Sequence, residues 1–178
     1  MRFYFVRHGE SLANSLKEIA VPETPLTKLG IEQARETARN VKGLGVTEIA
    51  CSSFLRAQQT AETIAGELGI DLAHIKVLKD FGERDYGELK GKPKTYGNEA
   101  YFSFDTEHGV ESRAQIIKRM QASLEEIKEL GGQTGLLLVV GHAVSGFYLT
   151  QVAKGKTEFE DFDPFFQIDN AGYIEIEI

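Results

Sequence analysis

The chain has 178 residues, of which 42% are hydrophobic and 26% charged, and its formal net charge at pH 7 is -7. This length suits one domain with a complete hydrophobic core, and the composition is that of an ordinary globular protein rather than a disordered or fibrous one. The acidic excess argues against a nucleic-acid partner, because binding to the phosphate backbone needs clustered lysine and arginine. Any anion-binding site must therefore be local.

The cysteine count and the short apolar runs argue against a disulfide-bonded or zinc-binding protein, a membrane-spanning protein and a secreted one. The single cysteine, Cys51, can form neither an intramolecular disulfide nor a cysteine-based zinc site. The longest apolar runs, 3–6 and 136–140, are far shorter than the roughly 20 residues of a membrane-spanning helix. The N-terminus lacks the long apolar region of a secretory signal, because Arg7 and His8 interrupt it. We expect a cytoplasmic protein with no membrane partner.

The first part of the chain predicts alternating strands and helices. Residues 3–6, Phe-Tyr-Phe-Val, predict a strand buried on both faces, which is typical of the middle of a parallel sheet. A helix is expected to begin after Thr27, a suitable N-cap. A second strand is predicted over 46–53, followed by a helix that Ser52 or Ser53 can cap.

The alternation continues toward the C-terminus. A third strand is predicted over 75–81, and Ser112 with Gln115 forms the capping box of a further helix. Residues 136–140, a run of leucine and valine, predict another fully buried strand. The sequence Asp-Asn-Ala-Gly at 169–172 is a turn signal between two apolar segments, which predicts a hairpin at the edge of the sheet.

This order of elements predicts an α/β protein. We expect one domain over 1–178, a three-layer α/β/α sandwich around a mostly parallel mixed sheet with the C-terminal hairpin as its antiparallel part. Residues 91–111 interrupt the pattern and are the expected insert or lid. Its aromatic residues are expected either to pack the insert onto the body or to wall the substrate cleft: Tyr96, Tyr101, Phe102 and Phe104.

Charged or titratable residues follow the C-terminal ends of four predicted strands. In open α/β sheets, ligands bind at the carboxyl ends of the strands, near helix N-termini, so these residues are expected at one rim. They are Arg7, His8, Arg56, Glu83, Arg84 and His142. Guanidinium groups bind phosphoryl oxygens bidentately, and helix N-termini add backbone N–H donors. The set predicts a phosphoryl-binding site.

A histidine in such a site can also react. A neutral imidazole attacks phosphorus and divides one difficult displacement into two easier ones, while cationic neighbours stabilise the charge on the nonbridging oxygens. Glu83 is the candidate proton donor to the leaving alcohol. Arg84 and Tyr86 follow it closely and are expected to contact the substrate.

Six motifs together resemble the histidine phosphatase superfamily, also called phosphoglycerate mutase-like. The resemblance covers about 3–150 and is specific as a set, whereas "RHG" alone recurs by chance. The motifs are RHGES, PLTKLGIEQA, SSFLRAQQTAETIA, GERDYGELKG, ESRAQIIKRM and VVGHAVSG, in this order. The resemblance implies a mixed sheet flanked by helices, with neither a metal nor an organic cofactor.

The resemblance also implies roles for particular residues. His8 would be the phosphorylated nucleophile, and Glu83 matches the acid/base carboxyl of the family. The phosphate pocket would be formed by Arg7, Asn14, Arg56 and His142. Ala143 follows where glycine is frequent in the family, so a backbone N–H contact to substrate is kept while the loop loses conformational freedom.

We therefore expect a metal-independent phosphomonoester hydrolase that acts through a phosphohistidine on a small phosphorylated metabolite. Phosphate or sulfate is expected to bind the same site. The insert lacks the paired arginines with which glycolytic mutases hold a phosphoglycerate, which favours a phosphatase over a mutase. Three alternatives stay open: a phosphoglycerate mutase, a phosphatase of phosphoproteins including phosphohistidine, and a regulatory module that binds phosphate without turnover. The sequence carries no signal for the oligomeric state.

Overall fold

The computed structural model describes residues 1–94, 108–131, 135–156 and 168–178. Within them, one sheet has the strand order β3-β2-β4-β1-β5. The first four strands along the chain are mutually parallel, whereas β5 pairs antiparallel with β1 at the edge. The strands are β1 (Arg2–Arg7), β2 (Val46–Ser52), β3 (Ile75–Leu78), β4 (Leu136–Gly141) and β5 (Tyr173–Glu177). The predicted mostly parallel mixed sheet is confirmed.

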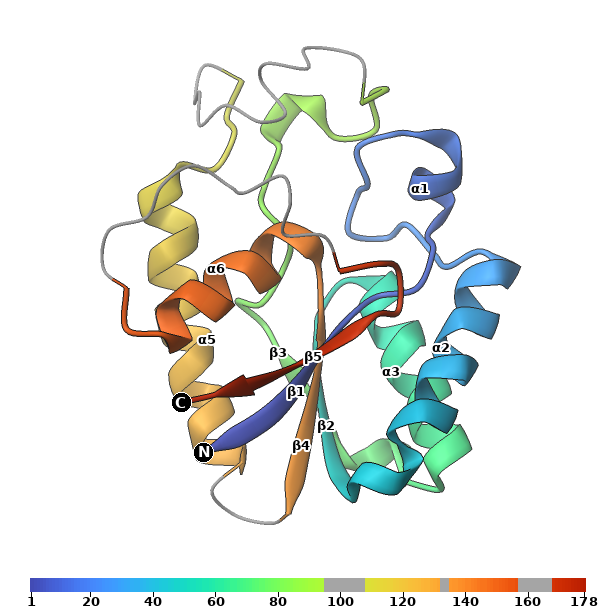
Figure 1. The fold of residues 1–178 in the computed structure, drawn as a ribbon. Coiled ribbons are helices and arrows are strands. Elements are labelled where there is room, and N and C mark those ends of the chain that lie inside the picture. The colour runs from blue at the N-terminus through green and yellow to red at the C-terminus, as the bar shows by residue number, and fades with distance from the viewer. Residues whose placement is uncertain (95–107, 132–134, 157–167) are drawn as a thin grey trace.

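Helices cover both faces of the sheet (Figure 1). The helices α2 (Lys28–Val41) and α3 (Leu55–Leu68) lie on one face, and α5 (Arg113–Gly131) and α6 (Ala143–Ala153) on the other. The shorter helices are α1 (Leu12–Leu16) and the 3₁₀ turns Lys42–Leu44, Leu72–His74 and Gly87–Leu89. The three-layer α/β/α sandwich is therefore confirmed.

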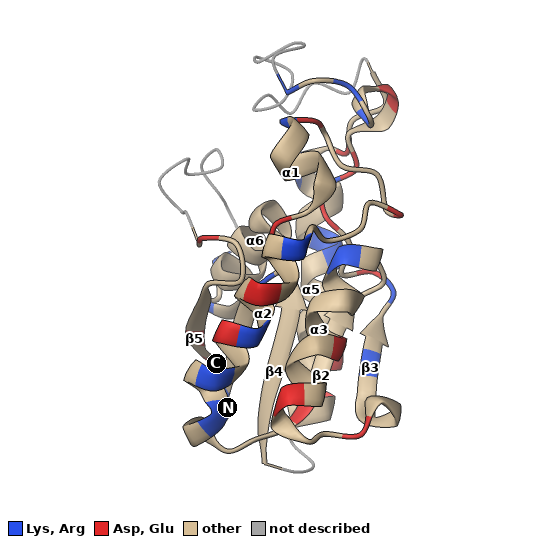
Figure 2. Cartoon of the chain, turned by 90° about the vertical axis from the view of Figure 1, so that its right-hand side faces the viewer, with Lys and Arg blue, Asp and Glu red and all other residues tan. Residues whose placement is uncertain are grey.

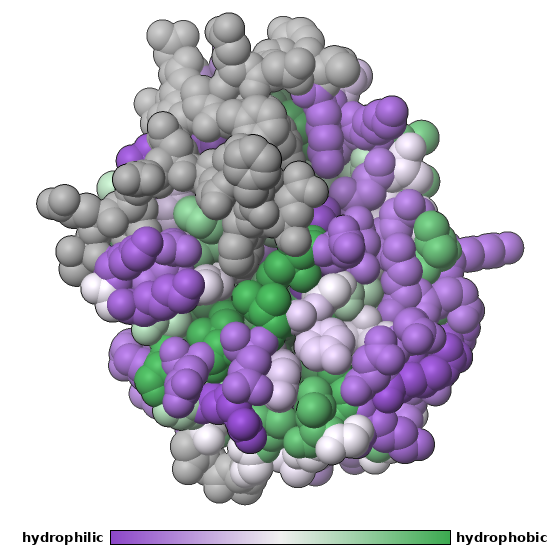
Figure 3. All heavy atoms as spheres, viewed as in Figure 1, coloured by the Kyte–Doolittle hydropathy of each residue, from purple (hydrophilic) through white to green (hydrophobic). Residues whose placement is uncertain are grey.

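Two hydrophobic cores lie between these layers. Phe3 and Phe5 of β1 pack toward α5 and α6, whereas Val6 packs toward α2 and α3. Covered on both faces, the strand is continuously apolar instead of alternating. Cys51 lies in the second core, where burial raises the pKa of its thiol to about 12. Hydrophobic residues also form a band over α6 (Figure 3).

Two glycines fix the turn that follows β1. Gly9 packs against Gly30 in the first turn of α2 so closely that a Cβ on Gly9 would overlap the Gly30 carbonyl, and a Cβ on Gly30 would overlap the carbonyl of Glu10. Thr27 caps α2 as predicted, because its hydroxyl accepts the Gly30 N–H at 3.0 Å. This contact holds the strand exit that carries the Arg-His pair.

The predicted N-cap of α3 is wrong. The helix begins at Leu55, and its N-cap, Phe54, makes no side-chain cap hydrogen bond. The Ser52 hydroxyl instead accepts the Phe54 N–H at 3.2 Å and lies 2.8 Å from Nε2 of His142. Ser52 at the end of β2 thus contacts His142, which follows the neighbouring strand β4. The chain then bends through Ser53 before the helix starts.

The third strand is shorter than predicted, whereas the capping box is confirmed. β3 ends at Leu78 because the chain turns there and brings the Phe81 ring edge-on to Phe5, with ring centroids 6.3 Å apart. Ser112 Oγ accepts the Gln115 N–H at 3.3 Å, and Gln115 Oε1 accepts the Ser112 N–H at 2.8 Å.

Parts of two predicted features lie outside the described residues. These are 95–107 of the insert, with its four aromatic residues, and 165–167 of the hairpin. The described end of the chain turns at Asn170 and Ala171 and enters β5, which confirms the antiparallel edge strand.

The outer surface of α2 and α3 carries interspersed basic and acidic residues (Figure 2). In the described part of the chain, every helix is too short or too polar to cross a bilayer.

Candidate active site

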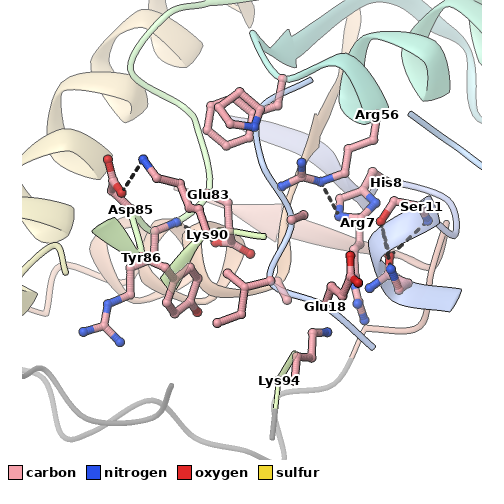
Figure 4. Close-up of a pocket in the computed structure, with 17 residues that line it drawn as sticks. Arg7, His8, Ser11, Glu18, Arg56, Glu83, Asp85, Tyr86, Lys90 and Lys94 are labelled. Carbon is pink, nitrogen blue, oxygen red and sulfur yellow. Dashed lines mark hydrogen bonds and ion pairs between the residues drawn. The ribbon is translucent and has the colours of Figure 1, made fainter. Parts of the chain in front are cut away.

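The predicted site residues gather at the carboxyl ends of the parallel strands, around a cavity of about 100 Å³. Those that line it are Arg7, His8, Asn14, Arg56, Glu83, Arg84, Tyr86 and Ala143. The remaining one, His142, is fully buried and packs beside His8, with ring centroids 5.2 Å apart. Figure 4 shows His8 and Arg56 on one side of the cavity and Glu83 on the other. The structure thus brings all nine residues together.

Hydrogen bonds define the tautomer of His8. Its Nδ1 lies 2.7 Å from the carbonyl oxygen of Gly9, and its Nε2 lies 3.2 Å from Nε of Arg56. A carbonyl can only accept and a guanidinium can only donate, so the network assigns the proton to Nδ1 and a lone pair to Nε2. The nitrogen that carries the lone pair therefore points at a cation inside the cavity.

The surroundings of His8 also keep it uncharged. Burial, followed by the positive charge of Arg56, lowers the pKa of His8 well below 6.5. The imidazole is thus neutral at physiological pH, which is the form that attacks phosphorus.

Two arginines bring positive charge to this side of the cavity. Arg56 lies in the first turn of α3, is 2% exposed, and donates from Nη1 to the Val21 carbonyl at 3.0 Å. Arg7 ends β1 and donates from Nη1 to the Ile168 carbonyl at 2.8 Å. Because carbonyl groups hold one nitrogen of each guanidinium group, we expect both arginines to stay on this side of the cavity when an anion binds.

His142 presents a buried donor beside His8. We assign the hydroxyl hydrogen of Ser52 to the contact with His142 Nε2, which places the ring proton on Nδ1; the bond that Ser52 Oγ accepts from the Phe54 N–H is compatible with this choice. Within the described residues, this Nδ1 is buried without a hydrogen-bond partner. Burial, then the charge of Arg56, lowers the pKa of His142 well below 6.5. A neutral ring with an unused N–H suits a phosphoryl oxygen.

The Glu83 carboxylate is held by the N-terminus of α6. Oε1 accepts backbone N–H groups from Arg84 and Ser145, both at 3.0 Å, and Oε2 accepts the N–H of Val144 at 3.2 Å. A helix N-terminus carries partial positive charge and favours a carboxylate. This arrangement leaves the acid at the cavity wall opposite His8.

Asn14 combines a structural and a candidate binding role. It forms a capping box with Ser11 at the start of α1, and Oδ1 accepts the Ser11 N–H at 3.0 Å and its hydroxyl at 2.8 Å. The carbonyl oxygen of the amide is therefore engaged, and Nδ2 is the group that a ligand oxygen would meet.

Arg84, Tyr86 and Ala143 line the cavity in different ways. Arg84 is buried, donates from Nε to the Glu111 carbonyl at 3.1 Å, and places its guanidinium 5.5 Å from the centre of the Tyr86 ring. Ala143 is the first residue of α6 and is helical, so the departure from glycine causes no backbone strain. Substrate contact by these three residues stays a prediction.

Sequence reasoning missed several residues around the cavity. Lys94 also lines it, and burial, then the charge of Arg7, lowers the pKa of Lys94. It lies in an irregular segment where no periodicity marks it. Ser11, Glu18, Asp85 and Lys90 complete the polar lining formed by the described residues. Across the described residues, no group of three or more histidine, cysteine or acidic side chains could hold a metal ion.

The two buried histidines predict an acid-sensitive fold. Because burial keeps His8 and His142 neutral, the unfolded chain binds more protons than the folded one below about pH 6.5. Stability is fully present above that pH and falls as the pH drops toward the lowered pKa values, by up to about 1.4 kcal/mol per pH unit for each histidine. Thermal unfolding between about pH 7 and about pH 5 measures this slope.

The matched variants separate these histidines from the rest of the chain. His142→Asn is expected to make the slope shallower, whereas His74→Asn, at an exposed position, keeps the wild-type slope. An unchanged slope in His142→Asn would contradict the assignment of a buried neutral ring.

Comparison with known proteins agrees with this geometry. The family model of the histidine phosphatase superfamily, branch 1, matches 3–178. A Yersinia pestis protein named "Probable phosphoglycerate mutase GpmB" is 32% identical over 150 residues, which cover 78% of this chain and 68% of that protein.

Solved structures share the fold. A mycobacterial glucosyl-3-phosphoglycerate phosphatase in complex with VO₃ has a TM-score of 0.78 and 20% identity, covering 98% of this chain and 90% of that one. A phosphoserine phosphatase mutant from Entamoeba histolytica, in complex with phosphoserine, has a TM-score of 0.77 and 21% identity. The match covers 98% of this chain and 89% of that one. The solved structures thus share the fold, and the family match shows the membership. The chain belongs to the histidine phosphatase superfamily, branch 1, and is an enzyme of the histidine phosphatase type.

Proposed function

We propose that this protein is a metal-independent phosphomonoester hydrolase that acts through a phosphohistidine at His8. The observation that carries the proposal is the state of that ring: Nδ1 is tied to a carbonyl, and Nε2 keeps a lone pair directed at Arg56. The oxygens of a phosphoryl group can accept hydrogen bonds from this guanidinium group. We expect Arg56 to exchange Nε2 for a phosphoryl oxygen when substrate binds, which frees the lone pair to attack.

In the first step, Nε2 of His8 forms a bond to phosphorus while the bond from phosphorus to the alcohol oxygen breaks. Arg7, Arg56 and the Nδ1–H of His142 would hold the three nonbridging oxygens, where negative charge accumulates. The leaving oxygen takes a proton from Glu83, which lies on the opposite side of the cavity and is expected to bind that proton when the negatively charged phosphoryl group enters beside it. The alcohol then leaves.

In the second step, Glu83 accepts a proton from a water molecule, whose oxygen attacks the phosphohistidine. The bond from phosphorus to Nε2 breaks, and inorganic phosphate departs, so His8 returns to its neutral tautomer and Glu83 to its protonated form. The two steps need the same two groups on opposite sides of one phosphorus atom. That requirement matches the separation of His8 and Glu83 across the cavity.

The size of the cavity supports a small substrate. Its volume of about 100 Å³, as formed by the described residues, suits a phosphoryl group, and a neighbouring cavity of about 850 Å³ that shares Phe54, Glu83 and Asp85 with it lies within the roughly 300–1,000 Å³ of pockets for small ligands. We propose a small phosphorylated metabolite as the substrate class.

A phosphoglycerate mutase is the second candidate, because the curated relatives bear that name. A mutase would return the phosphoryl group from His8 to another hydroxyl of the bound alcohol instead of passing it to water.

Turnover of a generic ester tests the proposal. With 4-nitrophenyl phosphate, we expect repeated turnover and release of inorganic phosphate, unchanged after dialysis against EDTA. Phosphate binding without release of nitrophenol would identify a binding module, and full loss of activity in EDTA would contradict metal independence. Isomerisation of 3-phosphoglycerate in the presence of 2,3-bisphosphoglycerate, faster than its hydrolysis, would favour the mutase.

A further inference from the structure

We propose that Arg119 of α5, supported by Glu111, is a positioning residue that holds Glu83 at the phosphoryl site. The inference rests on the function proposed above, because it concerns proton transfer by Glu83. Both residues belong to the motif ESRAQIIKRM. The roles proposed so far, phosphate binding and nucleophilic attack, do not explain this motif.

Glu83 needs such support because of where it lies in the fold. Residues 81–86 form neither helix nor strand, so no regular backbone pattern fixes the acid. The N-terminus of α6 orients the carboxylate, but it does so from the side-chain end only. The main chain of this segment needs a separate attachment.

Arg119 provides that attachment. Its Nη1 donates to the carbonyl oxygens of Asp80 and Gly82, the latter at 3.1 Å, and its Nη2 donates to the carbonyl oxygen of Glu83 itself at 3.4 Å. One guanidinium group therefore connects three carbonyl groups of the segment to a long helix. The carbonyl of the acid is one of the three.

Glu111 fixes the guanidinium in turn. Its carboxylate accepts Nε of Arg119 at 2.7 Å and Nη2 at 2.8 Å, which is the bidentate geometry of a strong ion pair. Oε2 also accepts the N–H of Asp85 at 3.1 Å, and the Glu111 N–H donates to the Asp85 carbonyl at 2.7 Å. Glu111, whose side chain is only 9% exposed, thus binds the segment directly at Asp85, on one side of Glu83, and through Arg119 on the other.

All five N–H donors of Arg119 are used in this arrangement. A lysine would keep the charge but offers three donors from one nitrogen, so it cannot bind a carboxylate bidentately and reach the carbonyl groups as well. Arg119→Lys is thus expected to loosen the segment without removing the charge. Displacement of a catalytic group by about 1 Å can lower a rate by about 10²-fold.

The dependence on the leaving group distinguishes positioning from general damage to the fold. Nitrophenolate leaves without a proton, whereas an alkoxide needs one from Glu83. For Arg119→Lys, we expect kcat/KM to fall by about 10- to 100-fold with a primary alkyl phosphate and by less than about threefold with 4-nitrophenyl phosphate. The ratio kcat/KM is the proper readout, because it includes only the steps up to release of the alcohol.

Two further variants sharpen the test. Glu111→Gln removes the ion pair and should show the same selective loss, which provides a second measurement if Arg119→Lys folds poorly. In a Glu83→Gln background, Arg119→Lys should add no selective loss, because residues that act as one unit are not additive. The matched control is Arg39→Lys on α2. The Arg39 guanidinium pairs with Glu36 at 2.9 Å on the exposed surface, and its replacement should change kcat/KM for neither ester.

The outcomes separate the two proposals. Equal loss for both esters, or no loss for either, in Arg119→Lys and Glu111→Gln would overturn the positioning role while leaving the phosphatase intact. Absence of turnover of both esters by the wild-type protein would instead overturn the proposed function.

Discussion

Replacement of His8 by alanine is expected to lower kcat/KM for 4-nitrophenyl phosphate by about 10⁴-fold or more. The reason is that the proposed reaction passes through a bond between phosphorus and Nε2. Among the described residues that line the cavity, no other group combines a lone pair with the position beside Arg56. Steady-state kinetics at neutral pH measure the effect.

Two controls accompany the His8 variant. His74→Ala changes an exposed histidine outside the cavity and should keep wild-type activity. Inorganic phosphate should still protect His8→Ala against thermal unfolding, because the arginines and His142 remain. Activity within about tenfold of wild type in His8→Ala would remove the nucleophile assignment.

Replacement of Glu83 by glutamine is expected to lower kcat/KM for a primary alkyl phosphate by about 10²- to 10⁴-fold, the usual contribution of a positioned general acid. The amide has nearly the same shape, and its one oxygen can still accept the Ser145 N–H, although its NH2 group then faces the Val144 N–H; it cannot deliver a proton as the acid does. The loss with 4-nitrophenyl phosphate should be much smaller, because its leaving group needs no proton. The ratio of the two kcat/KM values is the measurement.

The matched control is Glu88→Gln, at an exposed acid in the 3₁₀ turn Gly87–Leu89 that follows, which should change kcat/KM for neither ester. An equal loss for both esters in Glu83→Gln would contradict the role as proton donor and indicate a role in binding instead.

The strands and their exits could be predicted from the sequence because their signals are local. Four apolar residues in succession at Phe3–Val6, and again in β4, mark strands covered on both faces, and the polar residue after each must lie at the sheet rim. Thr27 and Ser112 mark helix starts through bonds that span three residues. These features are largely independent of the rest of the fold.

Contacts between distant segments were not predictable in the same way. Ser52 resembles a helix cap in the sequence, but its hydroxyl contacts His142, which lies 90 residues away. The attachment of Glu83 to Arg119 spans 36 residues, and its carboxylate is bound by α6, 61 and 62 residues away. No spacing rule encodes such pairs, because they depend on how the helices pack on the sheet. The sequence therefore predicted which residues gather at the cavity more fully than it predicted the contacts that hold them there.

The arrangement around His8 gives the site a physical rationale. A buried neutral imidazole is costly to protonate, and Arg56 makes it costlier, so the proposed nucleophile stays neutral below its usual pKa. The same arginine stands ready to bind the phosphoryl oxygens. In the proposed reaction, one cation thus suppresses protonation of His8 before substrate binds and stabilises the transferred phosphoryl group afterwards.

Trapping the covalent intermediate tests the central claim most directly. We expect the wild-type protein, mixed with a radiolabelled phosphate ester and quenched in alkali within milliseconds, to carry label on a peptide that contains His8. The label should be lost in acid and stable in alkali, as a phosphoramidate is, and it should be absent from His8→Ala. A label that survives acid but is lost in hydroxylamine would identify an acyl phosphate on a carboxylate and contradict attack by His8.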